Sequence, residues 1–455
     1  MIKTSAIFLF LNYCLGKKVD MSMVVAKIDW RQLYTFASRQ ALLGFCFDGI
    51  ERLTKEFSEE LKQNPMGRDL LMTWMGAAQQ IHRQNMKVNA VAGKLYSKFR
   101  EDGLRCCILK GQGNALMYPN PYSRTPGDID VWVNASREDI TDYAKTHFEI
   151  GDDIRFHHLE TSFDGVPVEL HFFPGIMNNP IYNARLQKWF KRNADLQCSN
   201  VVSLPDGIGE IAIPTRAFNV IYQLTHLYHH FFDEGIGMRQ IIDYFLVVND
   251  FSKNVFLDTD FSNHPVPLSK EGSTSHPDPL TLRGEGGNRP TRCSEPLRSK
   301  DGGPSKVSPD CAGWDRRGVS GDIASDASVS SAFTTDSSAS TALDVVQREL
   351  KYLGLWKFAG AVMFVLHEVL GLAEDKMIAP MDEKRGKLLL SEILNGGNFG
   401  KHFTKYGHFT QQGMAKKYFL KIWRNMHFVR YYPAEALSEP IFRTWHFFWR
   451  MKKNK

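Results

Sequence analysis

The chain has 455 residues, enough for two or three domains that each bury a sizeable core. Its 43% hydrophobic and 23% charged residues are ordinary for a soluble globular protein, and the net charge of +6 is compatible with anionic substrates. Seven cysteines without a Cys-x-x-Cys pair argue against a disulfide framework and against a zinc knuckle, so we expect a reducing, cytoplasmic setting.

Residues 1–22 carry one early lysine and a short apolar run, loosely like a signal peptide. The run has no convincing small-x-small cleavage site and is too short to span a bilayer. We therefore expect an unstructured extension. No other segment of the sequence reaches the length of a transmembrane helix.

Residues 23–100 are predicted to be helical. From Asp29 to about Leu61, and again from Arg68 to Phe99, apolar residues recur mostly at three- and four-residue spacing, which is the period of a helix with one buried face. We expect these helices to pack against a catalytic sheet or to cap its cleft, without chemistry of their own.

A catalytic domain is predicted over residues 101–205, beginning with the apolar strand Arg105–Leu109. The next four residues open a short helix, whose free backbone N–H groups can hold phosphate oxygens and whose glycines permit close approach. These candidate phosphate-binding residues are Lys110, Gly111, Gln112 and Gly113.

Three carboxylates are predicted to share one face of the sheet. Asp128 and Asp130 stand at the head of a strand, and residues two apart in a strand project from the same face. Two neighbouring carboxylates need a cation between them or a raised pKa. Glu169 lies on the polar face of a later strand, Pro167–Phe173. Mg²⁺ prefers oxygen ligands and bridges substrate phosphates, so we predict a Mg²⁺ (or Mn²⁺) site for phosphoryl or nucleotidyl transfer.

Two polar residues near these acids have open interpretations. Arg124 lies four residues ahead of Asp128, where it would either pair with a phosphate or form a structural ion pair with one of the site acids. His171, on the Glu169 face, would either orient Glu169 or make a simple structural hydrogen bond.

A glycine turn, an Asp-x-Asp at a strand start and a lone acid on a later strand resemble the nucleotidyltransferase fold of the polymerase-beta type. The strings Leu109-Lys-Gly, Gly127-Asp-Ile-Asp130 and Glu169-Leu-His171, with a second block from His226 to Asp243, resemble more closely a bacterial family of uncharacterised nucleotidyltransferases. The resemblance implies an α+β fold, a nucleotidyltransferase-type mixed β-sheet with flanking helices. One departure is Gly111-Gln112, where many nucleotidyltransferases have Gly-Ser, and it bears on how the triphosphate binds.

The resemblance implies transfer of an NMP from an NTP to an unidentified acceptor, which is a small molecule, a saccharide, a protein or RNA. Asp128 and Asp130 would hold the metals, and Glu169 would complete the second metal site and activate the acceptor hydroxyl. Lys110, Arg124 and the residues from Gly111 to Gly113 would bind the phosphates. The alternative is a catalytically inactive binding or scaffold protein on the same fold. Gln112 motivates this alternative, and the intact trio of acids argues against it.

Residues 206–257 are predicted to form the first part of a helical domain. His226, His229 and His230 occupy one helix face, where they would form a transition-metal site, line the substrate cleft or make structural hydrogen bonds. Asp243 stands among apolar residues, and we expect it to cap its helix or to pair with Arg239.

Residues 258–341 are rich in Ser, Gly, Pro, Asp and Thr and lack apolar periodicity, so we predict a disordered low-complexity insertion. Helical patterns resume over residues 342–455. A glycine run at 395–400 follows a predicted helix, and we interpret it as a helix stop instead of a phosphate loop. The tail mixes aromatic and basic residues, which would contact RNA, lie weakly on an anionic surface, or simply form a solvated basic face.

Overall fold

A five-stranded mixed sheet, in the strand order β1-β2-β5-β4-β3, organises the first half of the chain. Its strands are β1 (Cys106–Leu109), β2 (Ile129–Val133), β3 (Glu149–Ile154), β4 (His158–Phe163) and β5 (Val166–His171). The neighbours β2 and β5 are parallel, and the other pairs are antiparallel. The apolar residues that alternate along β2 and β5, such as Val131 and Val168, enter a buried core. The polar residues between them therefore line the opposite face.

The computed structural model describes residues 4–254, 341–403 and 414–453. These stretches belong to one of the two units into which the chain divides. The predicted low-complexity insertion, residues 258–341, lies outside the described residues except for Thr341.

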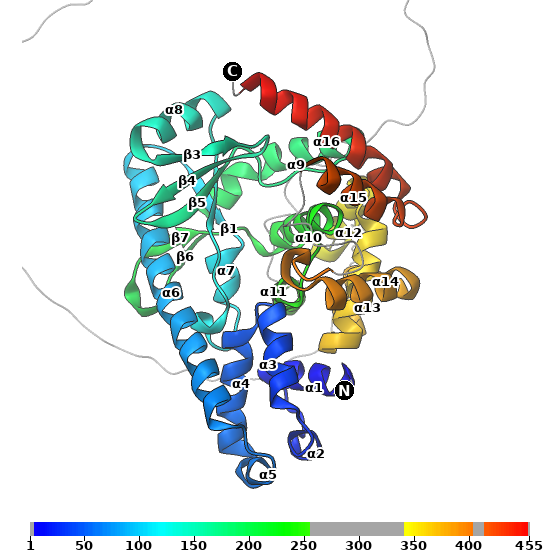
Figure 1. Cartoon of the computed structure of the whole chain (residues 1–455). Helices are drawn as coiled ribbons and strands as arrows, with labels where there is room; N and C mark the ends of the chain where they lie inside the picture. The colour runs from blue at the N-terminus through cyan, green and yellow to red at the C-terminus, as the bar shows by residue number, and fades with distance from the viewer. Residues whose placement is uncertain (1–3, 255–340, 404–413, 454–455) are drawn as a thin grey trace, which may run out of the picture. The chain divides into compact units, whose positions relative to one another are not determined.

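The N-terminal helices expected from the periodicity are present, and Figure 1 shows them below the sheet except for the last one, which runs up beside it. They are α3 (Trp30–Arg39), α4 (Leu43–Glu56), α5 (Ser58–Gln63) and α6 (Arg68–Glu101), and the four-residue helix α2 (Ser22–Val25) precedes the predicted pattern. The first long helical pattern is divided between α3 and α4, because Ala41 adopts a left-handed conformation with a φ of 56°. Helix α6 packs against both α4 and β1, so it connects this layer to the sheet.

The expectation of an unstructured extension over residues 1–22 is wrong. Residues Thr4–Cys14 form helix α1, in which Phe10, Leu11 and Tyr13 are buried. The Asn12 side chain donates a hydrogen bond of 2.8 Å to the Val369 carbonyl. The apolar run that suggested a signal peptide is a core helix, because it packs against α4 and against the much later helix α13 (Trp356–Leu370).

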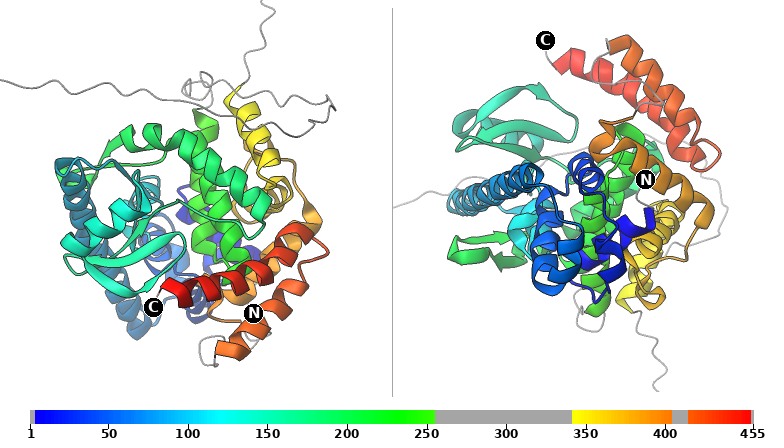
Figure 2. Two further views of the ribbon diagram at one scale, coloured as in Figure 1. Left: turned by 90° about the horizontal axis from the view of Figure 1, so that it is seen from above. Right: turned by 60° about the horizontal axis from the view of Figure 1, so that its bottom comes forward.

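Helices α10 (Arg216–Asp233) and α11 (Met238–Lys253) lie between the sheet and most of the helices that end the chain (Figures 1 and 2). The later helices are α12 (Ala342–Tyr352), α13 (Trp356–Leu370), α14 (Glu383–Gly396), α15 (Met414–Met426) and α16 (Pro433–Lys453). Around the sheet are α7 (Gly111–Ala115), α8 (Arg137–His147), α9 (Pro180–Ser199) and a two-stranded sheet of β6 (Val201–Ser203) and β7 (Glu210–Ala212). This mixed sheet with flanking helices confirms the predicted α+β fold class.

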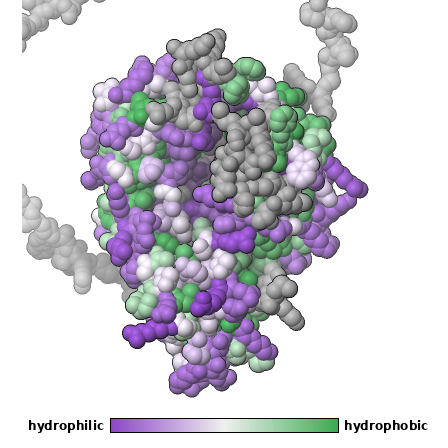
Figure 3. All heavy atoms as spheres, viewed as in Figure 1, coloured by the Kyte–Doolittle hydropathy of each residue, from purple (hydrophilic) through white to green (hydrophobic). Residues whose placement is uncertain are grey.

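The surface in view is mostly hydrophilic, with apolar residues in small patches (Figure 3). Among the described residues, no helix combines the length and the apolar character that a membrane span requires.

Candidate active site

The sheet brings the three predicted carboxylates together. Asp130 and Glu169 are register partners on the parallel strands β2 and β5, so their side chains leave the sheet on the same face. Asp130 is buried, with 4% of its surface exposed, whereas Asp128 immediately precedes β2 and is exposed. The structure therefore places one acid at the surface beside two acids that lie deeper.

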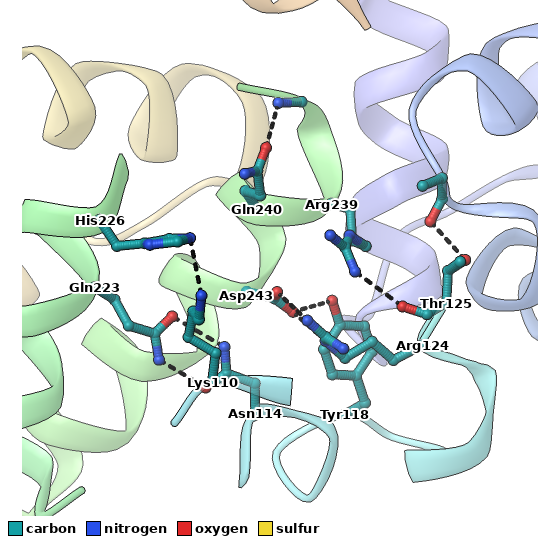
Figure 4. A network of polar contacts seen from close by, with 12 residues as sticks. Lys110, Asn114, Tyr118, Arg124, Thr125, Gln223, His226, Arg239, Gln240 and Asp243 are labelled. Carbon is teal, nitrogen blue, oxygen red and sulfur yellow. Dashed lines mark hydrogen bonds and ion pairs between the residues drawn. The ribbon is translucent and has the colours of Figure 1, made fainter. Parts of the chain in front are cut away.

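Lys110 points back from the turn between β1 and α7 towards the buried acid. Its backbone φ of 54° is uncommon for a residue with a side chain, and such strain is often found at functional positions. The Lys110 Nζ atom lies 2.9 Å from Asp130 Oδ1 and 3.3 Å from His226 Nε2. Figure 4 shows Lys110 and His226 meeting in this way. Lys110 thus neutralises part of the acidic cluster.

His171 bridges the two deeper acids. Its Nε2 atom lies 3.0 Å from Asp130 Oδ1 and 3.3 Å from Glu169 Oε2, while Nδ1 lies 3.3 Å from the Phe173 carbonyl oxygen. A carbonyl oxygen and ionised carboxylates only accept hydrogen bonds, so both ring nitrogens are placed as donors. Burial alone would lower the pKa of His171, but its hydrogen bonds with the two acids raise it to about 9. His171 therefore orients both acids, and not Glu169 alone.

The three acids differ in their affinity for protons. Partial loss of hydration, together with the charges of Asp130 and Glu169, raises the pKa of Asp128 to about 7. Burial opposes ionisation of the other two, but Lys110 and His171 outweigh it for Asp130 and hold its pKa well below the usual range. Burial also raises the pKa of Glu169, but the hydrogen bond with His171 outweighs this effect and lowers the pKa to about 2. A further cation is therefore favourable next to Asp128, which has no cationic partner of its own in direct contact among the described residues.

The donor atoms around these acids suit a divalent metal. In the described part of the chain, three sets of side chains bring three donor atoms within 4.8 Å of one another, and one of these sets is Asp130, Glu169 and His171. Carboxylate oxygens suit Mg²⁺ and Mn²⁺, and an imidazole nitrogen suits transition metals better than Mg²⁺. None of the three sets includes His226, His229 or His230, so the described residues give no support to a metal site on that helix face.

A pocket of about 460 Å³ opens beside Asp128 and Asp130. Lys110, Asn114, Gln223 and His226 line one wall (Figure 4). The Asn114 and Gln223 side chains exchange two hydrogen bonds, of 2.9 and 2.6 Å, which hold α7 against α10. This coupling sets the position of the turn that carries Lys110.

Only part of the predicted phosphate-binding turn lines this pocket. Lys110 and Gly111 do, but Gln112 and Gly113 are not among the lining residues. Gln112 is 3% exposed, and a Cβ atom on Gly113 would approach Ile213 Cγ2 to 3.1 Å. Gly113 therefore permits close packing against Ile213, which is a structural reason for its presence.

The opposite wall contains two arginines with different partners (Figure 4). Arg124 forms a two-point ion pair with Asp243, in which Nε and Nη2 donate hydrogen bonds of 2.9 and 2.8 Å. Tyr118 donates a third, of 2.7 Å, to the same carboxylate. The ion-pair interpretation of Arg124 thus holds, although its partner is Asp243 instead of a site acid. The expectation that Asp243 caps its helix or pairs with Arg239 is wrong, because its carboxylate accepts hydrogen bonds from Arg124 and Tyr118.

Arg239 was not predicted from the sequence to be a functional residue. Its Nη1 atom donates a hydrogen bond of 3.0 Å to the Thr125 carbonyl, and its Nε atom is buried without a hydrogen-bond partner in the described residues. Burial and the neighbouring charge of Arg124 lower the pKa of Arg239. A buried cation without a direct carboxylate partner favours an anionic ligand. The sequence signal that could have identified Arg239 was its position within the block from His226 to Asp243, which resembles the nucleotidyltransferase family.

A second depression, of about 560 Å³, also borders Asp128. It is lined by Glu149, Glu160 and Glu169 together with residues of β3, β4 and β5. Asp128 borders both depressions, whereas Asp130 lines only the first and Glu169 only the second, so a group bound at Asp128 would adjoin both.

A family model and a solved structure are similar to parts of this chain. A family model described as "Uncharacterised nucleotidyltransferase" matches residues 26–261, which is more than half of the chain. A solved structure described as an antigenic nucleotidyltransferase-like protein from Paracoccidioides brasiliensis is 17% identical, and the match covers 39% of this chain and 86% of that chain with a TM-score of 0.25. No match was found among curated proteins.

Proposed function

The chain belongs to the family of uncharacterised nucleotidyltransferases, and on that premise we propose that it transfers an NMP from an NTP to an acceptor with the help of a divalent metal. The observation that carries the proposal is the register of Asp130 with Glu169, with Asp128 beside them at the mouth of a pocket lined by basic side chains. A metal-bound triphosphate requires acids that bind the metal and, beside them, cations that bind the phosphates.

Asp128, Asp130 and Glu169 would hold Mg²⁺ or Mn²⁺. The metal would stabilise charge on the attacking and leaving oxygens of the displacement. The chain's own residues fix the acids for this role, because His171 contacts both deeper carboxylates and so limits their rotation.

Lys110 and Arg239 would bind the phosphates from opposite walls of the pocket. Lys110 would exchange its ion pair with Asp130 for a phosphate oxygen when that carboxylate holds a metal. Gly111 would bring its backbone close to the ligand. Arg124 lines the same pocket, but two of its donors are already bound to Asp243. We therefore propose that Arg124 stabilises that wall of the pocket and does not bind the phosphates directly.

Lys110→Met is expected to weaken NTP binding by roughly 10- to 150-fold, because a hydrogen bond to a charged group contributes about 1.5–3 kcal/mol. Equilibrium titration of the variant with NTP and metal measures the effect. Lys94→Met, which removes an exposed lysine far along α6, is the matched control and should bind NTP as the wild type does. Equal affinity in the Lys110 variant would contradict the assigned role.

The proposed reaction is tested by incubating the purified protein with each α-labelled NTP, a divalent metal and a cell extract. Label that appears in the protein, RNA or small-molecule fraction identifies the acceptor class, and the NTP that gives it identifies the nucleotide. The same incubation with Asp128→Ala/Asp130→Ala is expected to give no transfer. Transfer that persists in this variant would place the chemistry elsewhere.

The alternative is a catalytically inactive binding protein, and one observation favours it. Asp130 already contacts both Lys110 and His171, so its charge is compensated without a metal. An NTP that binds with equal affinity with and without metal, and is never cleaved, would support this alternative.

A further inference from the structure

A turn from the C-terminal helices completes the pocket. Besides the residues described above, the pocket is lined by Asn398, Phe399 and Lys401. These residues follow α14, in and next to the short 3-10 helix η5 (Asn398–Gly400), and lie well beyond the segment that the family model matches. The glycine run interpreted from the sequence as a helix stop thus also contributes a wall to the candidate active site.

We propose that Phe399 stacks on the base of the bound nucleotide, so that this turn is the base-binding subsite of the pocket. The inference rests on the proposed function, because it assigns the base end of the same NTP. Aromatic side chains that line a nucleotide pocket stack on bases of any identity, since every base has a π-face.

The position of Phe399 is fixed by close backbone packing. A Cβ atom on Gly237 would lie 2.7 Å from Asn398 Cα, so the turn before α11 touches the turn after α14 only because residue 237 is glycine. Phe399 itself has a φ of 54°, a left-handed conformation that is costly for a bulky residue. A strained residue held in place by its surroundings is frequent at ligand sites.

The ring of Phe399 adjoins the polar parts of the pocket. The Arg239 guanidinium carbon lies over the ring, 5.8 Å from its centroid, and the centroid of the His230 ring lies 5.3 Å from it, so a base would stack on the part of the ring that these two side chains leave open. Arg239 would hold a phosphate. Because the Phe399 ring lies close to Arg239, it can contact a part of the same ligand that adjoins this phosphate. The base would therefore lie against Phe399 while the triphosphate extends towards Lys110 and the acids.

Two further lining residues have unused hydrogen-bonding atoms in the described part of the chain. Gln240 Oε1 accepts a hydrogen bond of 2.7 Å from the Gly237 N–H, which fixes the amide and leaves Nε2 as a buried donor without a partner. Asn398 Oδ1 is buried and equally without a partner. Buried polar atoms are normally satisfied, and the edge of a base carries both donors and acceptors.

The test separates the base from the phosphates. Binding of each NTP and of inorganic tripolyphosphate is titrated in the presence of Mn²⁺ for the wild type, Phe399→Gly and Phe399→Tyr. Glycine suits the positive φ and removes the ring, whereas tyrosine keeps the ring. Phe447→Ala, at an exposed aromatic on α16, is the control. Thermal melts establish that each variant is folded.

We expect Phe399→Gly to weaken NTP binding by roughly 5- to 150-fold, with tripolyphosphate binding unchanged and NTP affinity restored in Phe399→Tyr. Unchanged NTP affinity in Phe399→Gly would overturn the subsite while leaving the proposed function in place. Parallel weakening of NTP and tripolyphosphate would also overturn it, because the residue would then act on the whole pocket. A wild type that binds neither ligand would overturn both the subsite and the proposed function.

Discussion

Replacing Asp130 with Asn is expected to lower the rate of nucleotidyl transfer by about 10³-fold or more. Asp130 is the buried acid at the centre of the trio, in register with Glu169 and in contact with Lys110 and His171. Asparagine keeps the shape but removes the charge that would bind a metal, and charge stabilisation by such a metal contributes several kcal/mol, at about 1.4 kcal/mol per factor of ten.

The measurement is pyrophosphate release under saturating NTP and metal. Asp164→Asn is the matched control, because Asp164 is an exposed acid in the turn between β4 and β5 and forms an ion pair with Lys94 of α6. Thermal melts of both variants separate lost chemistry from lost folding. If the Asp130 variant is folded and retains more than about a tenth of the wild-type rate, the proposed metal role of this acid is wrong, because a tenth corresponds to only about 1.4 kcal/mol.

Asp243→Ala is expected to lower the free energy of unfolding by about 3–5 kcal/mol, which is the usual cost of removing one member of a buried ion pair. Arg124 and Asp243 each expose only 6% of their side chains, so the guanidinium would remain buried without its partner. Tyr118 would lose its hydrogen-bond acceptor at the same time. Denaturant titration measures the loss.

A double variant, Arg124→Met/Asp243→Leu, distinguishes the pair from simple packing. If the cost comes from the stranded charge, removing both charges should recover most of the stability. If Asp243→Ala is as stable as the wild type, the buried pair does not hold this wall of the pocket. NTP titration of the double variant then tests whether the ion pair has only the supporting role assigned to Arg124.

The trio of acids could be predicted from the sequence because the signals are local. The alternation of polar and apolar residues around Asp128, Asp130 and Glu169 identifies the face of each strand without any knowledge of the partner strand. The long periodicity of residues 68–99 likewise predicted helix α6. The family was predicted from the same short strings, and the family model confirms it.

The features that escaped prediction depend on contacts between distant parts of the chain. Arg124 and Asp243 are 119 residues apart, and nothing near either residue indicates that they pair. The turn at Phe399 reaches the pocket only after the 255–340 stretch that lies outside the described residues. Strands β6 and β7 have three residues each, too few for a period to appear. Helix α1 was mistaken for an extension because its apolar run has no local sign of the helices that bury it.

The central claim is that this chain cleaves an NTP between its α- and β-phosphates, and two labels test it most directly. Incubation with α-labelled and, separately, γ-labelled NTP in Mn²⁺ or Mg²⁺ follows each end of the triphosphate. We predict that the α label moves to an acceptor and the γ label leaves as pyrophosphate, and that Asp128→Ala/Asp130→Ala abolishes both. Transfer of the γ label to the acceptor, or a folded protein that binds NTP and cleaves nothing with any acceptor fraction, would contradict the claim.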